Sequence, residues 1–348
     1  MIVHLCCIVK DEELYIEDWM LYYYNLGVDF IYIYNNDNDK TILPNLLYKS
    51  NKLKDFTYNF IIIPWINNQN DAYRHCWNRF SKDFDWLILN DIDEYIDLNG
   101  CSNGFFKKLK NEEILETDYE KYTNIKQLLE HYKDSKLLSL KWIIYDDNDL
   151  IERDMSKTVF ETFTRKNNKT DDKSYKSIFN KNLIKKFDTN AGHGLIENKW
   201  YTNPINNKET RNTDKIKYDV LENEPFIRHI ITYSLKEYLD QKYRRIFFDN
   251  SKHFIHYNLL NVRYFCYNNK TEEKLKYIKE YKRKNNITKI IYICSKDIYN
   301  KLFKTFDNRI CLILNYNKQK MEANFDDFQK YISDILQEFD QFIFLYDN

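Results

Sequence analysis

The sequence predicts an α/β fold: a mostly parallel sheet with helices on both faces, followed by a small C-terminal α/β module. Over the first hundred residues, short apolar runs alternate with stretches in which apolar side chains recur every three or four positions. The 30 Tyr, 23 Phe and 6 Trp side chains suffice for a packed core. Strand and helix in this alternation imply parallel strands joined by right-handed crossovers.

Each helix or strand expected in the first hundred residues is predicted by a local sequence pattern. The run from Ile2 to Val9 is short, apolar and followed at once by charged residues, as in a strand covered on both faces. From Asp11 to Leu26 the apolar spacing is helical, and Gly27 stands where a helix would end. The same reasoning predicts strands over 29–34, 56–64 and 85–89 and helices over 41–50 and 67–81.

The pattern is weaker after residue 100 and resumes near residue 271. We expect helix within 101–134, strands over 137–145 and 158–165, and polar loops over 166–176 and 202–217. Further on, the predicted elements are helices over 271–286, 297–306 and 325–339 and strands over 289–294, 309–316 and 341–346. This division predicts a first domain over 1–265 and an accessory α/β module over 271–348.

Composition excludes several classes of protein. The 53 basic side chains are balanced by 53 acidic ones, so the chain lacks the excess positive charge expected of a nucleic-acid-binding protein. Its seven cysteines are odd in number and form no Cys-x-x-Cys pair, which argues against a zinc knuckle or a disulfide framework. The N-terminal apolar run contains His4 and has no basic region before it, so we expect neither a signal peptide nor a membrane span, and a cytoplasmic location.

Three polar clusters follow predicted strands: Lys10 to Glu13, Asn35 to Asp39, and Asp91 to Glu94. In open α/β sheets ligands bind beyond the carboxyl ends of the strands, so these clusters should converge. Asp91 and Asp93, separated by one residue, can both face a divalent cation, and their oxygens suit Mn²⁺ or Mg²⁺. The alternative is that Asp-x-Asp is only a capped entrance to a loop.

Four blocks stand in order along the chain. They are IVKDE, EDW and LGVD within residues 8–29, IYNNDND at 33–39, WLILNDIDEY at 86–95, and HIITYSLKEY at 229–238. Together they resemble GT-A glycosyltransferases, in particular glycosyltransferase family 92 and its family 2-like bacterial relatives, over about residues 1–250. The resemblance implies a GT-A fold and a metal-dependent, inverting enzyme that transfers a hexose from a UDP-sugar donor to a glycan or glycosylated acceptor.

The resemblance also implies roles for individual residues. Asp91 and Asp93 would bind the metal and the donor, and His229 would complete the metal shell with a nitrogen that Mn²⁺ accepts. The side chains expected to line the nucleotide-sugar pocket are Lys10, Glu12, Asn36, Asp39 and Asp91. Three positions depart from the family pattern: Asp11 replaces Asn, Asp37-Asn38 replaces Gly-Ser, and Tyr233 replaces Lys.

Other assignments stay open. His193, between Gly192 and Gly194, competes with His229, because small neighbours allow a ligand to approach closely. Lys176 matches a basic position of the family that would contact phosphate, although a solvated loop lysine is the simpler interpretation. An inverting transfer needs a carboxylate base, for which Asp147 and Glu161 are the candidates.

Two other functions remain possible from the sequence. A haloacid-dehalogenase-type phosphatase also places Asp-x-Asp after a buried strand, but after the first strand of its sheet, whereas three strands precede the motif here. A non-catalytic nucleotide- or glycan-binding protein with a degenerate GT-A fold is the other alternative.

Overall fold

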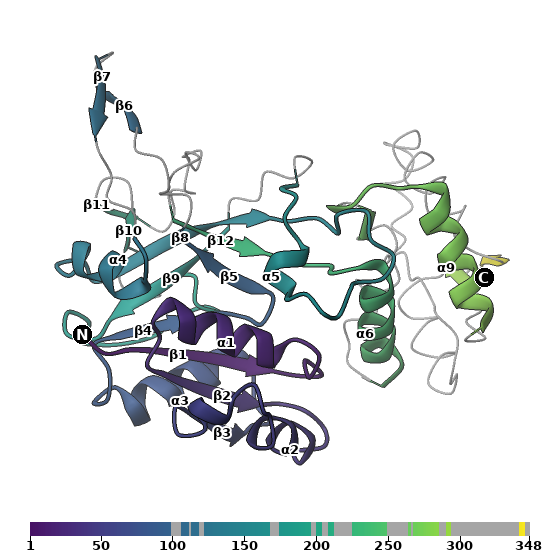
Figure 1. The fold of residues 1–348 in the computed structure, drawn as a ribbon, viewed down its shortest axis with the longest axis horizontal. Coiled ribbons are helices and arrows are strands. Elements are labelled where there is room, and N and C mark those ends of the chain that lie inside the picture. The colour runs from purple at the N-terminus through teal and green to yellow at the C-terminus, as the bar shows by residue number, and fades with distance from the viewer. Residues whose placement is uncertain are drawn as a thin grey trace. The chain divides into compact units, whose positions relative to one another are not determined.

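The core of the chain is an eight-stranded sheet with the strand order β3-β2-β1-β4-β9-β8-β12-β5 (Figure 1). The computed structural model describes residues 1–98, 106–110, 113–117, 122–167, 174–195, 200–203, 208–211, 225–248, 264–265, 267–284, 290–293 and 341–344. The strands of this sheet are β1 (Val3–Val9), β2 (Phe30–Asn35), β3 (Phe60–Pro64), β4 (Trp86–Leu89), β5 (Glu94–Asp97), β8 (Leu137–Ile144), β9 (Tyr175–Asn180) and β12 (Phe226–His229).

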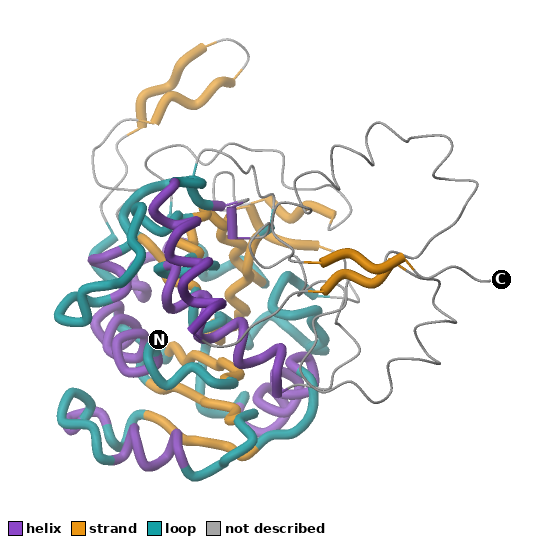
Figure 2. The backbone as a smooth tube through the Cα atoms, turned by 90° about the vertical axis from the view of Figure 1, so that its right-hand side faces the viewer, coloured by secondary structure: helices purple, strands orange, loops and turns teal. Residues whose placement is uncertain are grey.

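The remaining elements are helices and short strand pairs. The helices are α1 (Ile16–Leu26), α2 (Ile42–Tyr48), α3 (Gln69–Phe80), α4 (Ile125–His131), α5 (Val159–Thr162), α6 (Leu235–Phe248) and α9 (Glu272–Lys284), with a 3₁₀ turn η1 (Lys54–Phe56). The two-stranded ribbons, orange in Figure 2 like the sheet strands, pair β6 (Phe106–Lys110) with β7 (Glu113–Thr117), β10 (Trp200–Asn203) with β11 (Lys208–Arg211), and β13 (Ile290–Ile293) with β14 (Gln341–Phe344).

The direction in which strands are added to the sheet reverses between β1 and β4. The chain runs outward from β1 to β2 and β3 with parallel pairing, then returns to place β4 on the other side of β1, again parallel. Right-handed crossovers therefore put α1 and α3 on opposite faces of the sheet. The loops after β1 and β4 separate at this reversal, which is where open α/β sheets bind ligands.

The faces of β1 and β2 follow the alternation of their side chains. Cys6, Tyr32 and Tyr34 lie on the face that packs against Tyr73 and Cys76 of α3 in one buried cluster. On the other face, α1 ends at Gly27, whose φ of 103° is a left-handed conformation that favours glycine.

The predicted α/β class with a mostly parallel sheet is confirmed. Four of the seven strand pairings are parallel and three, all involving β9 or β5, are antiparallel. The strands and helices expected before residue 90 are present within a few residues of their predicted bounds.

Three predictions after residue 100 are wrong. Within 101–134 the described helix is only α4, and β6 and β7 form a hairpin instead. The expected strand over 158–165 is the short helix α5, which begins at a capping box formed by Thr158 and Glu161. The expected loop over 202–217 contains β11, which pairs with β10, whereas the expected loop over 166–176 differs only in ending two residues early, where β9 begins. The elements expected over 297–339 lie outside the described residues.

The chain divides into two compact units. One comprises residues 1–145 and 155–231, and the other comprises residues 146–154 and 232–348. The predicted boundary after residue 265 differs from this grouping, and the independence of the module over 271–348 stays a prediction. Among the described helices, none combines the length and apolar character needed to cross a membrane.

Candidate metal centre

The Asp91–Glu94 segment forms a tight turn between β4 and β5. The Glu94 amide donates to the Asp91 carbonyl at 3.1 Å, and the Asp91 amide donates to Glu94 Oε2 at 3.0 Å. Helix α1 holds this turn from one side: Trp19 Nε1 donates to the carbonyls of Asp91 and Glu94, both at 3.1 Å, and the Tyr23 hydroxyl donates to the Glu94 carbonyl at 3.0 Å. The first helix thus fixes the backbone that carries the aspartates.

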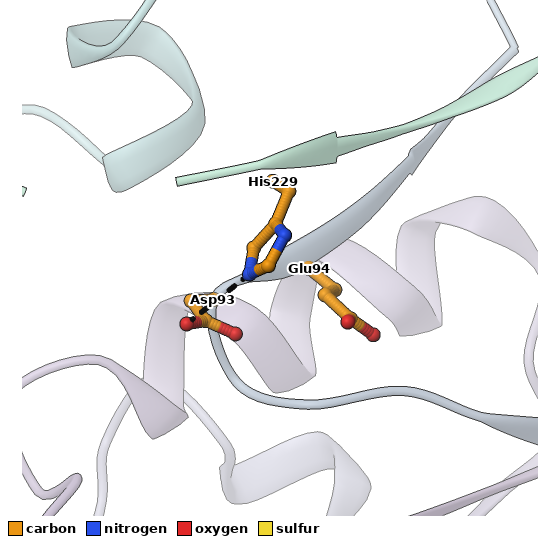
Figure 3. Close-up of side chains that lie close together, drawn as sticks. All are labelled: Asp93, Glu94 and His229. Carbon is orange, nitrogen blue, oxygen red and sulfur yellow. Dashed lines mark ion pairs between the residues drawn. The ribbon is translucent and has the colours of Figure 1, made fainter. Parts of the chain in front are cut away.

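Asp93, Glu94 and His229 form a cluster that could hold a metal ion (Figure 3). Antiparallel pairing of β12 with β5 sets His229 opposite Glu94, and His229 Nε2 lies 3.5 Å from Asp93 Oδ2. One ligand atom from each of the three residues lies within 4.8 Å of the other two.

The donor chemistry of this cluster fits the implied cation. Glu94 is fully buried, and its Oε1 has no hydrogen-bond partner. Two carboxylates and an imidazole make an oxygen and nitrogen set that Mn²⁺ accepts.

Burial and neighbouring charges shift both groups. Burial raises the pKa of Glu94, and the negative charge of Asp91 acts in the same direction, while Lys176 opposes them. For His229, burial by itself lowers the pKa, but the Asp93 carboxylate outweighs burial and raises it above the ordinary value. A positive charge placed beside Glu94 therefore favours its carboxylate form, whereas His229 must release its proton before its nitrogen can bind a cation.

Asp91 lies beside the cluster and is occupied on both oxygens. Its Oδ2 accepts a hydrogen bond from Lys176 Nζ at 2.9 Å. Its Oδ1 accepts hydrogen bonds from Gln69 Nε2 at 2.6 Å and from the Tyr73 hydroxyl at 3.3 Å. Asp91 and Asp93 thus have different partners, although the sequence predicts the same metal role for both.

Lys176 is not the solvated loop lysine of the simpler interpretation. It lies on β9, and its side chain is 1% exposed. Burial alone would lower its pKa, but Asp91 and Glu94 outweigh burial and raise it to about 12. Because its ammonium is buried against Asp91 and the Ala191 carbonyl, the predicted contact with donor phosphate does not fit this arrangement.

The loops after β1 and β2 are joined to each other. The Asn36 amide donates to the Val9 carbonyl at 2.8 Å, and the Asp11 amide donates to Asp37 Oδ1 at 2.7 Å. Asp11 has a φ of 55°, a left-handed conformation that Asp tolerates better than most residues. Asp37, which replaces the glycine of the family pattern, therefore supports this turn with its buried carboxylate.

The predicted nucleotide residues divide between these loops. Lys10 and Glu12 follow β1 and are partly buried, as is Asn36 after β2. Asp39 is exposed, and its Oδ1 accepts hydrogen bonds from the amide and hydroxyl of Thr41, at the start of α2. The structure thus gives Asp39 a local role as the support of a helix start.

His193 lies in a glycine-rich loop near the cluster. Its Nδ1 hydrogen-bonds the Tyr175 carbonyl, and its ring stands edge-on to Trp142 at 5.3 Å. Trp142 also contacts the ring of His229 at 4.2 Å, which makes it a shared neighbour of both histidines. Of the two histidines, His229 is the one that joins the acidic cluster.

The two predicted catalytic bases have other roles in the structure. Asp147 is fully buried in the second unit, where Lys274 Nζ lies 2.6 Å from its Oδ2 and the Tyr264 hydroxyl donates to the same oxygen. Glu161 is exposed, and its Oε2 accepts hydrogen bonds from the Thr158 amide and hydroxyl. A carboxylate that neutralises a buried lysine and one that caps a helix are poorly placed to accept a proton from a substrate.

Sequence reasoning missed Gln69, Tyr73 and Trp142. The first two lie in the first turns of α3, which follows β3 and so begins near the carboxyl edge of the sheet. That placement could have signalled them, because a helix that follows a parallel strand starts at the ligand-binding edge. Trp142 gave no such signal in a chain with 59 aromatic side chains, counted as 30 Tyr, 23 Phe and 6 Trp.

Comparisons with known proteins give partial similarity. No family model matches the chain. It is 26% identical over 98 residues, or 28% of its length, to a glycosyltransferase family 92 protein of Oryza sativa subsp. japonica. It is 25% identical over 91 residues, or 26% of its length, to one of Arabidopsis thaliana. The matches cover 16% of each relative, so the chain spans about a sixth of the length of the curated relatives it matches.

Solved structures align at low similarity. S. aureus TarS residues 1–349 in complex with UDP aligns with a TM-score of 0.33 at 12% identity, covering 76% of this chain and 71% of that one. The 4-diphosphocytidyl-2C-methyl-D-erythritol synthase of Anaerococcus prevotii aligns with a TM-score of 0.28 at 11% identity, covering 52% of this chain and 71% of that one. In sequence, the chain is similar over about a quarter of its length to curated proteins of glycosyltransferase family 92.

Proposed function

We propose that the chain is a metal-dependent glycosyltransferase that transfers a hexose from a UDP-sugar to a carbohydrate acceptor with inversion. The observation that carries the proposal is the convergence of Asp93, Glu94 and His229 at the carboxyl edge of the sheet. The partial similarity to glycosyltransferase family 92 proteins supports the same chemistry.

Asp93 and His229 would hold the cation, with Glu94 as the third ligand. A divalent cation held there would supply positive charge that stabilises the departing diphosphate of a nucleotide sugar. Trp19 and Tyr23 keep the Asp91–Glu94 turn rigid through hydrogen bonds to its carbonyls, so the ligands are oriented before the donor arrives.

The joined loops after β1 and β2 would bind the nucleoside. Asn36, Lys10 and Glu12 lie on these loops, and the hydrogen bond from the Asp11 amide to Asp37 holds one loop against the other. A preorganised loop pair reduces the entropy lost when the donor is bound. The donor would thus lie across the carboxyl ends of β1, β2 and β4.

The test is release of UDP from a panel of UDP-hexoses by the full chain, with and without Mn²⁺. We expect Mn²⁺-dependent turnover that Asp93→Asn abolishes. Asp83→Asn is the matched control, because Asp83 is an exposed aspartate that precedes the same strand, and it should leave turnover unchanged.

Three results would contradict the proposal. If the Asp93→Asn variant turned over as fast as the unaltered chain, the cluster would not be the metal site that the reaction needs. Nucleotide binding by calorimetry without transfer to any of a broad panel of glycan acceptors would favour the non-catalytic alternative. For an active enzyme, a product whose anomeric proton shows by its NMR coupling constant that the configuration is retained would contradict inversion.

A further inference from the structure

We propose that Lys176 is a positioning residue whose buried ammonium takes Asp91 as its counter-ion, so that Asp91 is not a ligand of the cation. The inference rests on the proposed function, because it concerns the cation that the proposed transfer needs. The two aspartates of the Asp-x-Asp motif then have different roles: Asp93 is a ligand of the cation, and Asp91 is the counter-ion of a buried lysine.

The first support is the set of contacts on Asp91. Lys176 Nζ donates to Oδ2 at 2.9 Å, and Gln69 Nε2 and the Tyr73 hydroxyl donate to Oδ1 at 2.6 and 3.3 Å. These donors come from β9 and from the first turns of α3. A carboxylate fixed from two elements has its orientation set by the fold.

The second support is the burial of Lys176. Its side chain is 1% exposed, and besides Asp91 its ammonium contacts the Ala191 carbonyl at 2.9 Å and Glu94 Oε1 at 3.5 Å. If Asp91 turned toward a cation, the ammonium would lose its nearest counter-charge while it stayed buried. Although the Asp91 side chain is 35% exposed, the Lys176 ammonium is buried, and a buried charge without its counter-charge is destabilising, so this rearrangement is disfavoured.

The glycine-rich loop that contains Gly192 packs against the side chain of Lys176. Gly192 has a φ of 80°, and a Cβ built there would lie 3.1 Å from the Leu89 carbonyl oxygen and 3.2 Å from Lys176 Cδ. The loop backbone therefore packs directly on the lysine stem, where a larger residue would collide.

Asp93 faces a different partner. Its side chain is 29% exposed, close to the 35% of Asp91, and it faces His229 Nε2 at 3.5 Å. In Figure 3 the Asp93 carboxylate and the His229 ring turn toward each other, and Glu94 follows directly along the chain. A cation can therefore approach Asp93 from solvent without breaking the pair between Asp91 and Lys176.

The first arm of the test measures Mn²⁺ affinity of the full chain by electron paramagnetic resonance of the free ion. We expect Asp93→Asn to weaken affinity by about tenfold or more, as loss of a ligand should. Asp91→Asn should change it by no more than about twofold, and Gln69→Ala, which removes one support of Asp91, should behave like Asp91→Asn. Equal losses in Asp91→Asn and Asp93→Asn would overturn the inference.

The second arm measures urea unfolding of Asp91→Asn, Lys176→Met and the double variant. We expect each single change to lower the unfolding midpoint and the double variant to recover at least part of the loss of Lys176→Met, because it no longer buries an unpaired charge. A double variant whose loss equals the sum of the single losses would contradict the pairing. Should Lys176→Met fail to fold, recovery of folding by the double variant is the expected result, and failure of both would count against the pairing.

The two arms separate this inference from the proposed function. Absence of sugar transfer alongside the expected Mn²⁺ pattern would refute the proposed function and leave the division of the motif intact. Absence of Mn²⁺ binding to the unaltered chain would overturn both, and the unfolding arm would then decide only whether the pair is structural.

Discussion

Replacing Tyr23 by Phe tests whether α1 holds the metal-binding turn. The Tyr23 hydroxyl donates to the Glu94 carbonyl at 3.0 Å and accepts from Asn90 Nδ2 at 2.7 Å, and all three residues are buried. The carbonyl keeps its hydrogen bond from Trp19, whereas the Asn90 amide loses its acceptor. Two lost hydrogen bonds, one of which leaves a buried donor unpaired, should cost about 2–3 kcal/mol of unfolding free energy.

The matched control is Tyr24→Phe on the same helix. The Tyr24 hydroxyl donates to the Asn59 carbonyl at 3.0 Å, before β3 and away from the turn. This change should cost about 1 kcal/mol. Urea unfolding measures both losses, and Mn²⁺ titration measures the consequence for the site.

We expect Tyr23→Phe to weaken Mn²⁺ affinity by on the order of tenfold, because a looser turn no longer orients Asp93. Tyr24→Phe should leave the affinity unchanged. If the two variants lose equal stability and bind Mn²⁺ equally well, the turn does not depend on α1 and the reasoning is refuted.

Three further predictions concern the surrounding fold. The buried Asp97 accepts a hydrogen bond from Arg228 on its Oδ2 at 2.6 Å. Arg228→Met removes this charge partner and should lower the free energy of unfolding by about 3–5 kcal/mol in urea. A loss below about 1 kcal/mol would contradict the prediction. Gly192→Ala should lower the thermal midpoint, since its Cβ would meet the Leu89 carbonyl oxygen at 3.1 Å with φ at 80°; an unchanged midpoint would show that the loop yields freely. Burial lowers the pKa of His4 to about 4, whereas its value in the unfolded chain is near 6.5. Below pH 6.5 the unfolded chain therefore binds a proton that the native chain does not, and the free energy of unfolding falls as the pH drops toward 4. In pH-dependent urea unfolding, His4→Phe should reduce this loss of stability by roughly 2–3 kcal/mol, and equal pH dependence of the two proteins would refute the prediction.

The first half of the fold follows from local pattern because its elements agree with their propensities. β1 is an uninterrupted apolar run, and α1 and α3 carry helical spacing with a Gly27 end and an Asn68 cap. The sequence does not predict β9 because Lys176 is its second residue, and a lysine breaks the apolar pattern of a buried strand unless it is known to have a partner. That partner, Asp91, is distant in the sequence and adjacent only in the fold.

The candidate site was predictable where topology alone decides. Asp93 is expected near a cation because it follows a parallel strand, whose carboxyl end lies at the ligand-binding edge of the sheet, whereas the metal role of His229 is implied only by the family resemblance. The surroundings of Asp147 could not be predicted, because an acidic loop looks solvated in a sequence, whereas Lys274 neutralises this carboxylate inside the second unit. The contacts of Glu161 could not be predicted either, because Val, Phe and Thr neighbours favour a strand, while its capping box with Thr158 begins a helix.

The central claim is that Asp93 and His229 bind a divalent cation, and that this cation binds the phosphates of a nucleoside diphosphate. The most direct measurement is an anomalous difference map at the manganese edge from crystals of the full chain grown with Mn²⁺ and UDP. The account predicts one strong peak in coordination with Asp93 and His229, in contact with the UDP phosphates and separated from Asp91. A peak coordinated by Asp91 in place of Asp93, or UDP bound with no peak beside His229, would contradict it.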